Sequence, residues 1–547
     1  MTRTNADAVV IGAGHHGLVA AIVLADAGWD VVVLEGQPDV GGAVRSAEGY
    51  PGFTVDRFSA FYPLSAASRV IKSLDLDQHG LNWVHAPAVV VHPHGVDDEV
   101  GAALYRDPQR TADALSVDAP ADRASYLRLV EQWEQIKEPF LDALLTAWPP
   151  VKAATRLFAR LGTADALRMA RFLTLPATRM GEELFEGELG RRLLAGNAMH
   201  ADSPIDGAVS GTFGWLLVML GQDVGFPVPE GGAGQLAEAL RRRAESAGAT
   251  VLTGDAVTSI VVGNGRAVGV RTAAGHEYAA RRAVLADVSA PALYTKLLPQ
   301  GSVPARLIDE LENFDWDLGT VKIDYALAGP VPWRAAAASE AGTVHVGADL
   351  DDEGKPIGAV EGLVRWNADL RSRRVPIAPF GLTGQMTTTD PSRSPAGTES
   401  FWAYTHVPKG MADDATADQV AVNMEKVLER HAPGFRDLVL DRVVQRPSDL
   451  QSNDANLVGG AVNGGTSQLH QQLVFRPTPG PGGSRTAVDG LYLASAATHP
   501  GGGVHGACGY LAARAALRDT APVLGPLRRR ASSAVLDLLY RESSPSR

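Results

Sequence analysis

Residues 7–35 read DAVVIGAGHHGLVAAIVLADAGWDVVVLE, and this stretch decides the fold. Its first part, 7–11, is apolar and β-branched, as a buried parallel strand requires. The run 18–28 predicts a helix, and 30–34 predicts a second buried strand. The turn GAGHHG between the first strand and the helix has the spacing GxGxxG. This order of elements predicts a Rossmann-like βαβ unit, and therefore an α/β fold.

Each position of this turn has a physical task if the unit holds a dinucleotide. Gly12 permits the tight turn, Gly14 lets the backbone approach a pyrophosphate, and Gly17 lets the helix pack close to the strand. His15 and His16 lie at the start of the helix, where unpaired N–H groups favour phosphate. We therefore count both histidines among the cofactor-binding positions, without assigning chemistry to their rings.

The residues after the second strand extend this site. Glu35 follows the first glycine by about 20 residues and is placed to accept the hydroxyls of a ribose. Gly41 and Gly42 let the chain pass close to the pyrophosphate, and Arg45 supplies a positive charge to it. A nicotinamide dinucleotide needs no such extension, so residues 12–45 predict FAD.

A second glycine-rich stretch lies near the C-terminus. Residues 490–517 read GLYLASAATHPGGGVHGACGYLAARAAL. They predict a short strand at 491–493, a turn at 498–503 and a helix with a face of small residues. Small residues let loop backbone and a helix N-terminus approach a flat ligand. We expect this turn to bind the same cofactor as the first one.

Both stretches resemble a known family. Residues 12–45 resemble the FAD-binding fingerprint of the amine oxidase and phytoene desaturase flavoproteins, and residues 491–506 resemble the late motif of the phytoene desaturase-like group. Within that group, the sequence of this late motif is most similar to the branch that contains pyridine nucleotide-disulfide oxidoreductase domain-containing protein 2. The resemblance implies that the backbone of Val257 contacts the adenine, although a plain core position in a strand is an open alternative. It also places these residues at the flavin and ribityl chain: Ser495, Thr498, Pro500, Gly501, Gly502, Gly503 and Val504.

The distribution of these motifs predicts two interleaved domains. The FAD-binding domain is expected to comprise residues 1–105, 223–300 and 451–525. A glycine-rich loop and helix at 226–247 and a hairpin turn at 263–265 belong to it. Residues 106–222 are expected to form a helical cap, 301–450 a mixed-sheet substrate domain, and 526–547 a C-terminal tail.

Composition excludes several classes of protein. A net charge of −12 argues against nucleic acid as a partner. No apolar run reaches the roughly 18 residues of a membrane span. With Cys508 as the only cysteine, a dithiol mechanism within the chain is impossible, and no metal-ligand spacing is present. The first strand begins so early that a cleaved secretory signal has no room, so we expect a cytoplasmic protein.

One helical stretch suggests contact with a membrane surface. Residues 151–175 contain a single acid, Asp165, several basic residues, and several large apolar residues that could form a surface. Such a basic, amphipathic segment is typical of a helix on a lipid surface, here the inner face of the membrane. The more ordinary interpretation is a solvated helix that packs its apolar face on the core. The basic residues of the stretch are Lys152, Arg156, Arg160, Arg168 and Arg171.

The predicted chemistry is transfer of hydride to flavin from a hydrophobic, isoprenoid-like or alicyclic substrate, with oxygen, a quinone or a soluble carrier as electron acceptor. His499, or else His505, is the candidate catalytic base because imidazole titrates near neutrality. Gln472 and Arg476 are expected near the ring, chiefly as structural hydrogen-bonding groups. Cys508 is expected to be a small buried thiol, with covalent attachment to flavin as the alternative. A flavin amine oxidase, a redox-neutral isomerase and a non-catalytic FAD protein remain open.

Overall fold

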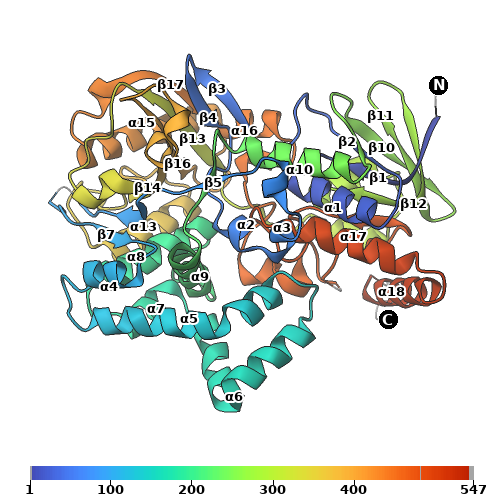
Figure 1. Cartoon of the computed structure of the whole chain (residues 1–547), viewed down its shortest axis with the longest axis horizontal. Coiled ribbons are helices and arrows are strands. Elements are labelled where there is room, and N and C mark those ends of the chain that lie inside the picture. The colour runs from blue at the N-terminus through green and yellow to red at the C-terminus, as the bar shows by residue number, and fades with distance from the viewer. Residues whose placement is uncertain (1–2, 96, 481, 541–547) are drawn as a thin grey trace, which may run out of the picture.

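A largely parallel sheet contains the βαβ unit predicted at residues 7–35. The computed structural model describes residues 3–95, 97–480 and 482–540. The strand order is β10-β11-β12-β1-β2-β9, with β18 also paired to β12 (Figure 1). β10 and β11 form the antiparallel hairpin predicted at 263–265, and the other pairings among β9, β2, β1, β12 and β18 are parallel. The strands are β1 (Arg3–Ile11), β2 (Val31–Leu34), β9 (Thr250–Leu252), β10 (Val257–Gly263), β11 (Arg266–Thr272), β12 (Glu277–Ala286) and β18 (Leu491–Leu493).

Three helices from distant parts of the chain cover one face of this sheet. They are α1 (His15–Asp26), α10 (Gly234–Ser246) and α17 (Ala507–Asp519), and Figure 1 shows α1 between the other two. Small residues permit close helix packing: a Cβ on Gly509 of α17 would lie 1.9 Å from the carbonyl oxygen of His16 in α1. The two glycine-rich motifs therefore sit side by side, at the N-terminal ends of two packed helices.

A second mixed sheet forms the other half of the molecule. Its order is β17-β13-β16-β15-β14-β6-β7, and only β14–β6 is parallel among its described pairings. Alternation along β16 separates its two faces: Phe401 and Ala403 join one core under α15 (Asp414–His431), while Trp402 joins another near α13 (Ala359–Arg371). The strands are β6 (Ala88–His92), β7 (Ala102–Leu104), β13 (Thr320–Leu327), β14 (Ala341–Val346), β15 (Gly381–Gln385), β16 (Glu399–His406) and β17 (Val439–Gln445).

The second sheet corrects the first domain boundary predicted from the sequence. β6 and β7 were assigned to the FAD-binding domain within residues 1–105, but they pair with each other and with β14 of the second sheet. The apolar sequence of β6 indicates that the strand is buried, but it does not indicate which sheet the strand joins. The chain therefore crosses between the two halves before Ala88.

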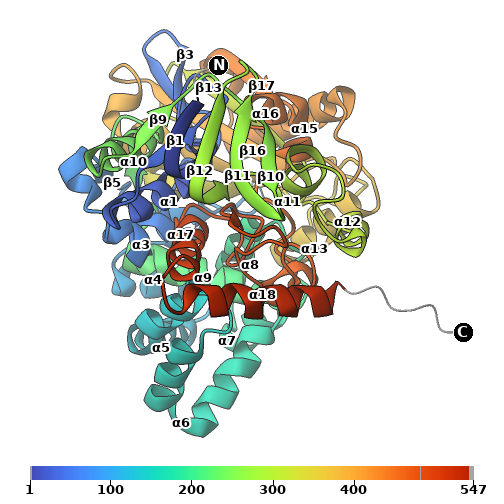
Figure 2. The ribbon, with the colours of Figure 1, turned by 90° about the vertical axis from the view of Figure 1, so that its right-hand side faces the viewer.

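A group of helices lies below the second sheet in Figures 1 and 2, and α6 (Val151–Thr174) extends furthest from the body. α5 ends and α6 begins on either side of the Pro149-Pro150 stop that the sequence predicts. α6 bends at Gly162, whose φ of +73° is not helical. Trp133, Phe140 and Trp215 pack edge to face in the core of this region. The helices are α4 (Pro108–Leu115), α5 (Asp122–Leu144), α6 (Val151–Thr174), α7 (Ala177–Leu184), α8 (Glu188–Ala198) and α9 (Ser210–Asp223).

The remaining helices and strands are shorter elements between these parts, together with the last helix, α18. They are β3 (Ser46–Tyr50), β4 (Phe53–Asp56), α2 (Pro63–Ala67), α3 (Arg69–Lys72), β5 (Trp83–Val84), β8 (Val228–Pro229), α11 (Ala290–Ala292), α12 (Ala305–Leu311), α14 (Met386–Thr389), α16 (Pro447–Asn453) and α18 (Gly525–Leu539). α18 lies against α17.

The arginines of α6 are paired with acids. Their partners lie on α5, on α7 or within α6 itself, so the local excess of positive charge counted from the sequence is largely neutralised. The apolar side chains of Phe158 and Leu167 remain exposed, at 55% and 73%. None of the helices in the described residues is long and apolar enough to cross a membrane. The pairs are Arg156–Asp142, Arg160–Glu138, Arg168–Asp165 and Arg171–Glu183.

Candidate active site

The glycine-rich turns meet at one cavity of about 410 Å³. Gly14 and Gly42 line it from the N-terminal side, and Gly502 and Gly503 line it from the late motif. These residues lie more than 450 positions apart in the chain but share one wall because α1 packs on α17. The parallel strands β1, β2 and β12 end at this same edge, which is where ligands bind in open α/β sheets.

The N-terminal turn has the geometry that its glycines predict. Gly12 has a φ of +91°, and a Cβ on Gly17 would lie 2.1 Å from the carbonyl oxygen of Gly12. A Cβ on Gly14 would lie 2.7 Å from a carboxylate oxygen of Asp287. The amide of Gly41 donates to the carbonyl of Ala13 over 2.8 Å, so the second glycine pair lies directly on the first turn. Gly14 and Gly42 therefore contribute only backbone to this part of the wall.

Glu35 and Arg45 flank the turn. The Glu35 carboxylate accepts the amides of Ala13 and Gln37, each over 2.8 Å, and this fixes it at the end of β2. The Arg45 guanidinium donates to the carbonyl of Gly42 over 3.0 Å, and its pKa is lowered by burial. Both side chains therefore border the turn, as the predicted roles require. The ribose and pyrophosphate contacts themselves remain predictions.

The late turn is held by one buried arginine. Arg476 is 1% exposed and donates to the carbonyls of Asn463, Thr466 and Ala496, each over 2.9 Å. Burial lowers its pKa to about 10. Gln472 donates to the carbonyl of Thr466 over 2.9 Å. Neither Arg476 nor Gln472 lines the cavity, which agrees with the structural role expected for them.

The predicted cofactor positions divide into two groups. Residues of the first group line the cavity directly: Gly14, His15, His16, Gly42, Ser495, Pro500, Gly502, Gly503 and Val504. Residues of the second group are not part of the cavity wall: Gly12, Gly17, Glu35, Gly41, Arg45, Thr498 and Gly501 belong to the turns or flank them, and Val257 lies on β10.

His499 is not where the sequence placed it. Its Nε2 donates to the carbonyl of Thr146 over 3.0 Å, and its ring lies edge-on to Trp148. It is absent from the cavity wall, although Pro500 next to it is present. The side chain therefore turns toward the connection between α5 and α6 and does not line the cavity, and its role as catalytic base stays a prediction.

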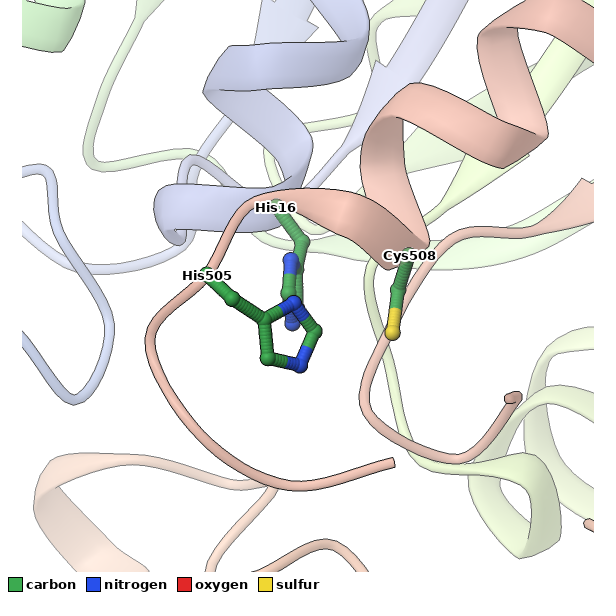
Figure 3. A group of neighbouring side chains, drawn as sticks. All are labelled: His16, His505 and Cys508. Atoms are coloured by element: carbon green, nitrogen blue, oxygen red, sulfur yellow. The ribbon is translucent and has the colours of Figure 1, made fainter. Parts of the chain in front are cut away.

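Three buried side chains converge between the starts of α1 and α17: His16, His505 and Cys508 (Figure 3). His505 already accepts the amide of Ala507 at Nδ1 over 3.0 Å and donates from Nε2 to the carbonyl of Gly501. The Cys508 thiol points to the carbonyls of Thr498 and Gly501, and burial raises its pKa to about 12. Two helix N-termini disfavour a cation here. The cluster is better explained as packing, with Cys508 as the buried thiol that the sequence predicts.

Asp287 is a site residue that the sequence analysis missed. It directly follows β12, at the edge where β1 also ends, and it lines the cavity. Its carboxylate accepts the amide of Gly17 over 2.8 Å. Burial raises its pKa to about 8. The signal was present in the sequence as an acid placed immediately after an apolar strand.

The rest of the cavity wall is largely apolar. Lys322 on β13 and the rings of Trp402 and Tyr404 on β16 also belong to its wall. The two rings are stacked, with centroids 6.0 Å apart, and the Lys322 ammonium is paired with buried Asp324. A lysine two residues before an aspartate in an apolar strand is the pattern that could have revealed this pair. The apolar lining residues are Phe61, Leu64, Leu144, Leu145, Phe213, Leu216, Leu217, Phe226 and Leu382.

These features fit a bound FAD. A Cβ on Gly14 would lie against Asp287, and a Cβ on Gly42 would lie against Gly14. Both positions therefore favour glycine, which leaves the backbone accessible along this wall. The buried ring nitrogens of His16 have no partner within the described part of the protein, so a ligand in the cavity has polar groups to meet there. Both glycine-rich turns border the same cavity, so one dinucleotide can contact both of them. Bound FAD supplies an acceptor for two electrons and a proton.

The fold and site define an FAD-dependent oxidoreductase. Residues 17–517 match the model of the family described as flavin containing amine oxidoreductase, and the chain belongs to that family. It is 28% identical to pyridine nucleotide-disulfide oxidoreductase domain-containing protein 2 of Mus musculus, over 94% of this chain and 93% of that protein. It is 22% identical to one component of the limonene dehydrogenase of Castellaniella defragrans, over 94% of each chain. Among solved structures, putrescine oxidase bound to putrescine is similar with a TM-score of 0.60, at 16% identity, over 94% of this chain and 99% of that chain.

Proposed function

We propose that this FAD-dependent oxidoreductase is a dehydrogenase or desaturase of a hydrophobic, isoprenoid-like or alicyclic substrate. The observation that supports the proposal most is the apolar part of the cavity wall, formed by side chains of α9, β15 and the end of α5. Such a wall stabilises an uncharged hydrocarbon skeleton by removing it from water, and it offers little to a hydrophilic ligand. The similarity to a component of a limonene dehydrogenase agrees with a substrate of this class.

The experiment that tests the proposal is anaerobic mixing of the FAD-loaded protein with limonene and, separately, with putrescine. Bleaching of the visible flavin band by limonene or a related hydrocarbon is the expected result. Bleaching by the amine alone would overturn the proposal. Analysis of the product distinguishes a redox-neutral isomerase, because isomerisation leaves the molecular mass of the substrate unchanged.

A flavin amine oxidase is the second candidate, and one observation favours it. Trp402 and Tyr404 present a stacked aromatic pair to the cavity, and aromatic faces attract ammonium groups. Against this function, the ammonium of Lys322 already lies 5.9 Å from the centre of the Trp402 ring. A substrate ammonium at the same ring would meet a like charge, so we place this function second.

We also propose that α6 offers a route for an apolar substrate from a lipid surface. Leu144 and Leu145, at the end of α5 and just before α6, line the cavity. Phe158 and Leu167 on α6 expose apolar surface to the outside. Their proximity along the chain supports a path from an apolar exterior to an apolar interior. Because the arginines of α6 are ion-paired, the attraction would come from apolar insertion more than from charge.

A further inference from the structure

Three carboxyl groups border the glycine-rich turns of the cavity. Asp287 and Asp454 belong to its wall. A carboxylate oxygen of Asp287 lies 2.7 Å from where a Cβ on Gly14 would be. A carboxylate oxygen of Asp454 lies 3.4 Å from where a Cβ on Gly42 would be. The third group is Glu35, which accepts a backbone amide of the first turn, so acidic groups gather where the backbone is open to a ligand.

Little positive charge faces these acids. Within the described part of the chain, no cationic side chain pairs with Asp287 or lowers its pKa. The charged groups that face Asp287 are Asp454 and Glu35, both acids, and the thiol of Cys508 on α17 lies near it as well. Arg45 interacts electrostatically with Asp454 and Glu35, but its guanidinium donates to backbone carbonyls. A negative charge on Asp287 is therefore not compensated by a neighbouring cation.

The start of α1 does not supply the missing charge. His15 and His16 line the cavity, and burial lowers the pKa of His15 to about 4 and that of His16 well below its ordinary value. Both rings are therefore neutral near pH 7, whichever of their nitrogens carries the proton. The first amides of a helix attract an anion, but the amide of Gly17 already donates to Asp287 over 2.8 Å. An ionised Asp287 thus uses a donor that an anionic ligand would otherwise meet.

The diphosphate of FAD adds negative charge to this wall. In a dinucleotide site of this kind the backbone at Gly14 approaches the pyrophosphate, and Asp287 lies against Gly14. Like charges repel more strongly in a buried site than in water. A proton on Asp287 removes one of these charges. The neutral carboxyl group can still accept the amide of Gly17 with its carbonyl oxygen, while its hydroxyl becomes a donor.

Of the two acids in the wall, Asp287 is better suited to hold this proton. Burial is the largest cause that raises its pKa, to about 8, so the proton is taken up readily near neutrality. Burial also raises the pKa of Asp454, but Arg45 acts in the opposite direction there. Asp287 has no such cation beside it in the described part of the chain.

We propose that FAD binds to this protein together with one proton, and that Asp287 holds the proton as a neutral carboxylic acid in the wall of the FAD site. The proton comes from solvent and forms an O–H bond on the carboxylate, and no electron is transferred. The apoprotein loses this proton as the pH rises through the pKa of Asp287, whereas the FAD complex keeps it, so the affinity for FAD falls with rising pH. The inference concerns the FAD site and does not depend on the substrate proposed above.

Calorimetric titration of the apoprotein with FAD, in two buffers that differ in ionisation enthalpy, counts the protons taken up on binding. Uptake should be close to zero at about pH 6 and about three-quarters of a proton at about pH 8.5. The dissociation constant of FAD should rise about fourfold between these two pH values. Binding of FAD without proton uptake at the higher pH would overturn the inference and leave the FAD site standing. A protein that binds no FAD at either pH would overturn both.

Asp287→Asn tests which group holds the proton, because an asparagine amide is neutral and keeps an acceptor for the amide of Gly17. It should take up no proton at either pH, and at about pH 8.5 it should bind FAD about fourfold more tightly than the natural protein does. Asp454→Asn should still take up a proton at the higher pH. Uptake that persists in Asp287→Asn would overturn the assignment.

The matched control is Glu399→Gln, which removes another buried carboxyl group. Burial raises the pKa of Glu399 to about 7, and its carboxylate accepts the amides of Thr387 and Thr388, but it is not part of the cavity wall. Proton uptake and FAD affinity in this variant should equal those of the natural protein. Loss of the uptake in Glu399→Gln would contradict a proton held at the FAD site.

A second measurement does not depend on a variant that folds. The infrared difference spectrum between the FAD complex and the apoprotein at about pH 8.5 should gain the C=O stretching band of a protonated carboxyl group. Labelling the aspartates with carbon-13 should shift this band and leave the carbonyl bands of the flavin in place. A spectrum without a band that the label shifts would overturn the proposal.

Discussion

The amide of Gly17 and the carboxylate of Asp287 are joined by a hydrogen bond of 2.8 Å, across 270 positions of sequence. This contact ties the start of α1 to the end of β12, where both elements border the cavity. Burial is the largest cause of the raised pKa of Asp287, the hydrogen bond from Gly17 lowers that pKa, and the nearby acids Asp454 and Glu35 raise it further. The glycine turn is therefore linked to a group that titrates near neutrality.

The first prediction concerns the pH dependence of stability. Asp287 titrates at about 8 in the folded protein, against 3.8 for an ordinary aspartate. Between these values the folded state holds the proton and the unfolded state does not, so the free energy of unfolding falls as pH rises. The slope from this group is at most about 1.4 kcal/mol per pH unit and vanishes above the folded pKa. Urea unfolding of the apoprotein at a series of pH values measures it.

Asp287→Asn is the matched variant because an amide oxygen can still accept the amide of Gly17. It should be more stable than the natural apoprotein near pH 7 and should show a flatter pH profile over the same interval. Parallel profiles for the two proteins would contradict the raised pKa.

The second prediction concerns Glu35. Glu35→Ala should weaken FAD retention by roughly 1–3 kcal/mol, the usual scale for a lost hydrogen bond to a charged group. Equilibrium dialysis of FAD against the apoprotein measures the change. Glu35→Gln keeps one acceptor for the amide of Ala13, so its FAD retention should lie between that of the natural protein and that of Glu35→Ala. Unchanged retention in Glu35→Ala would remove the ribose assignment.

The third prediction concerns the contact between α1 and α17. A methyl group on Gly509 would overlap the carbonyl oxygen of His16 at 1.9 Å, so the helices must separate. Gly509→Ala should lower the free energy of unfolding by about 1–3 kcal/mol and weaken FAD binding. Gly483→Ala is the control, because no described atom lies within 4 Å of its added Cβ. Equal melting temperatures for the two variants would show that this packing is looser than described.

The fourth prediction concerns α6. If its exposed apolar residues meet lipid, replacing Phe158 and Leu167 by Asp should reduce binding to phosphatidylcholine vesicles by roughly tenfold, since insertion of two apolar side chains is lost. Co-sedimentation with vesicles measures it. Val117→Asp, at a site 66% exposed outside α6, should bind as the natural protein does. No binding by the natural protein would leave α6 as a solvated helix.

The sequence was sufficient for the parts that depend on local backbone geometry. The strand, turn and helix around Gly12, Gly14 and Gly17 follow from periodicity and from the special conformations of glycine. The hairpin at Asn264 and the buried thiol of Cys508 follow in the same way. The match to the flavin containing amine oxidoreductase family confirms the resemblance on which FAD was predicted.

The parts that the sequence did not reveal depend on contacts between distant segments. β6 is an apolar strand that fits either sheet, and only its pairing with β14 decides between them. His499 stands in a cofactor motif, yet its ring reaches Thr146, a residue of the cap. His200 has no neighbouring motif at all, yet it lines the cavity and lies next to His345 of β14. Local patterns contain none of this information.

The central claim is that the Gly14 turn binds the adenosine diphosphate part, and the Gly502 turn the flavin part, of one FAD. Binding of ADP and of FMN to the apoprotein and to single variants tests this directly. Gly14→Ala, whose Cβ would lie 2.7 Å from Asp287, should weaken the binding of ADP by more than about tenfold and the binding of FMN by less than about threefold. Gly502→Ala, whose Cβ would lie 2.8 Å from Asn463, should do the reverse, and FAD should displace both fragments with one FAD per chain. Fragments that remain bound beside FAD, or a protein that takes up no FAD, would contradict this claim.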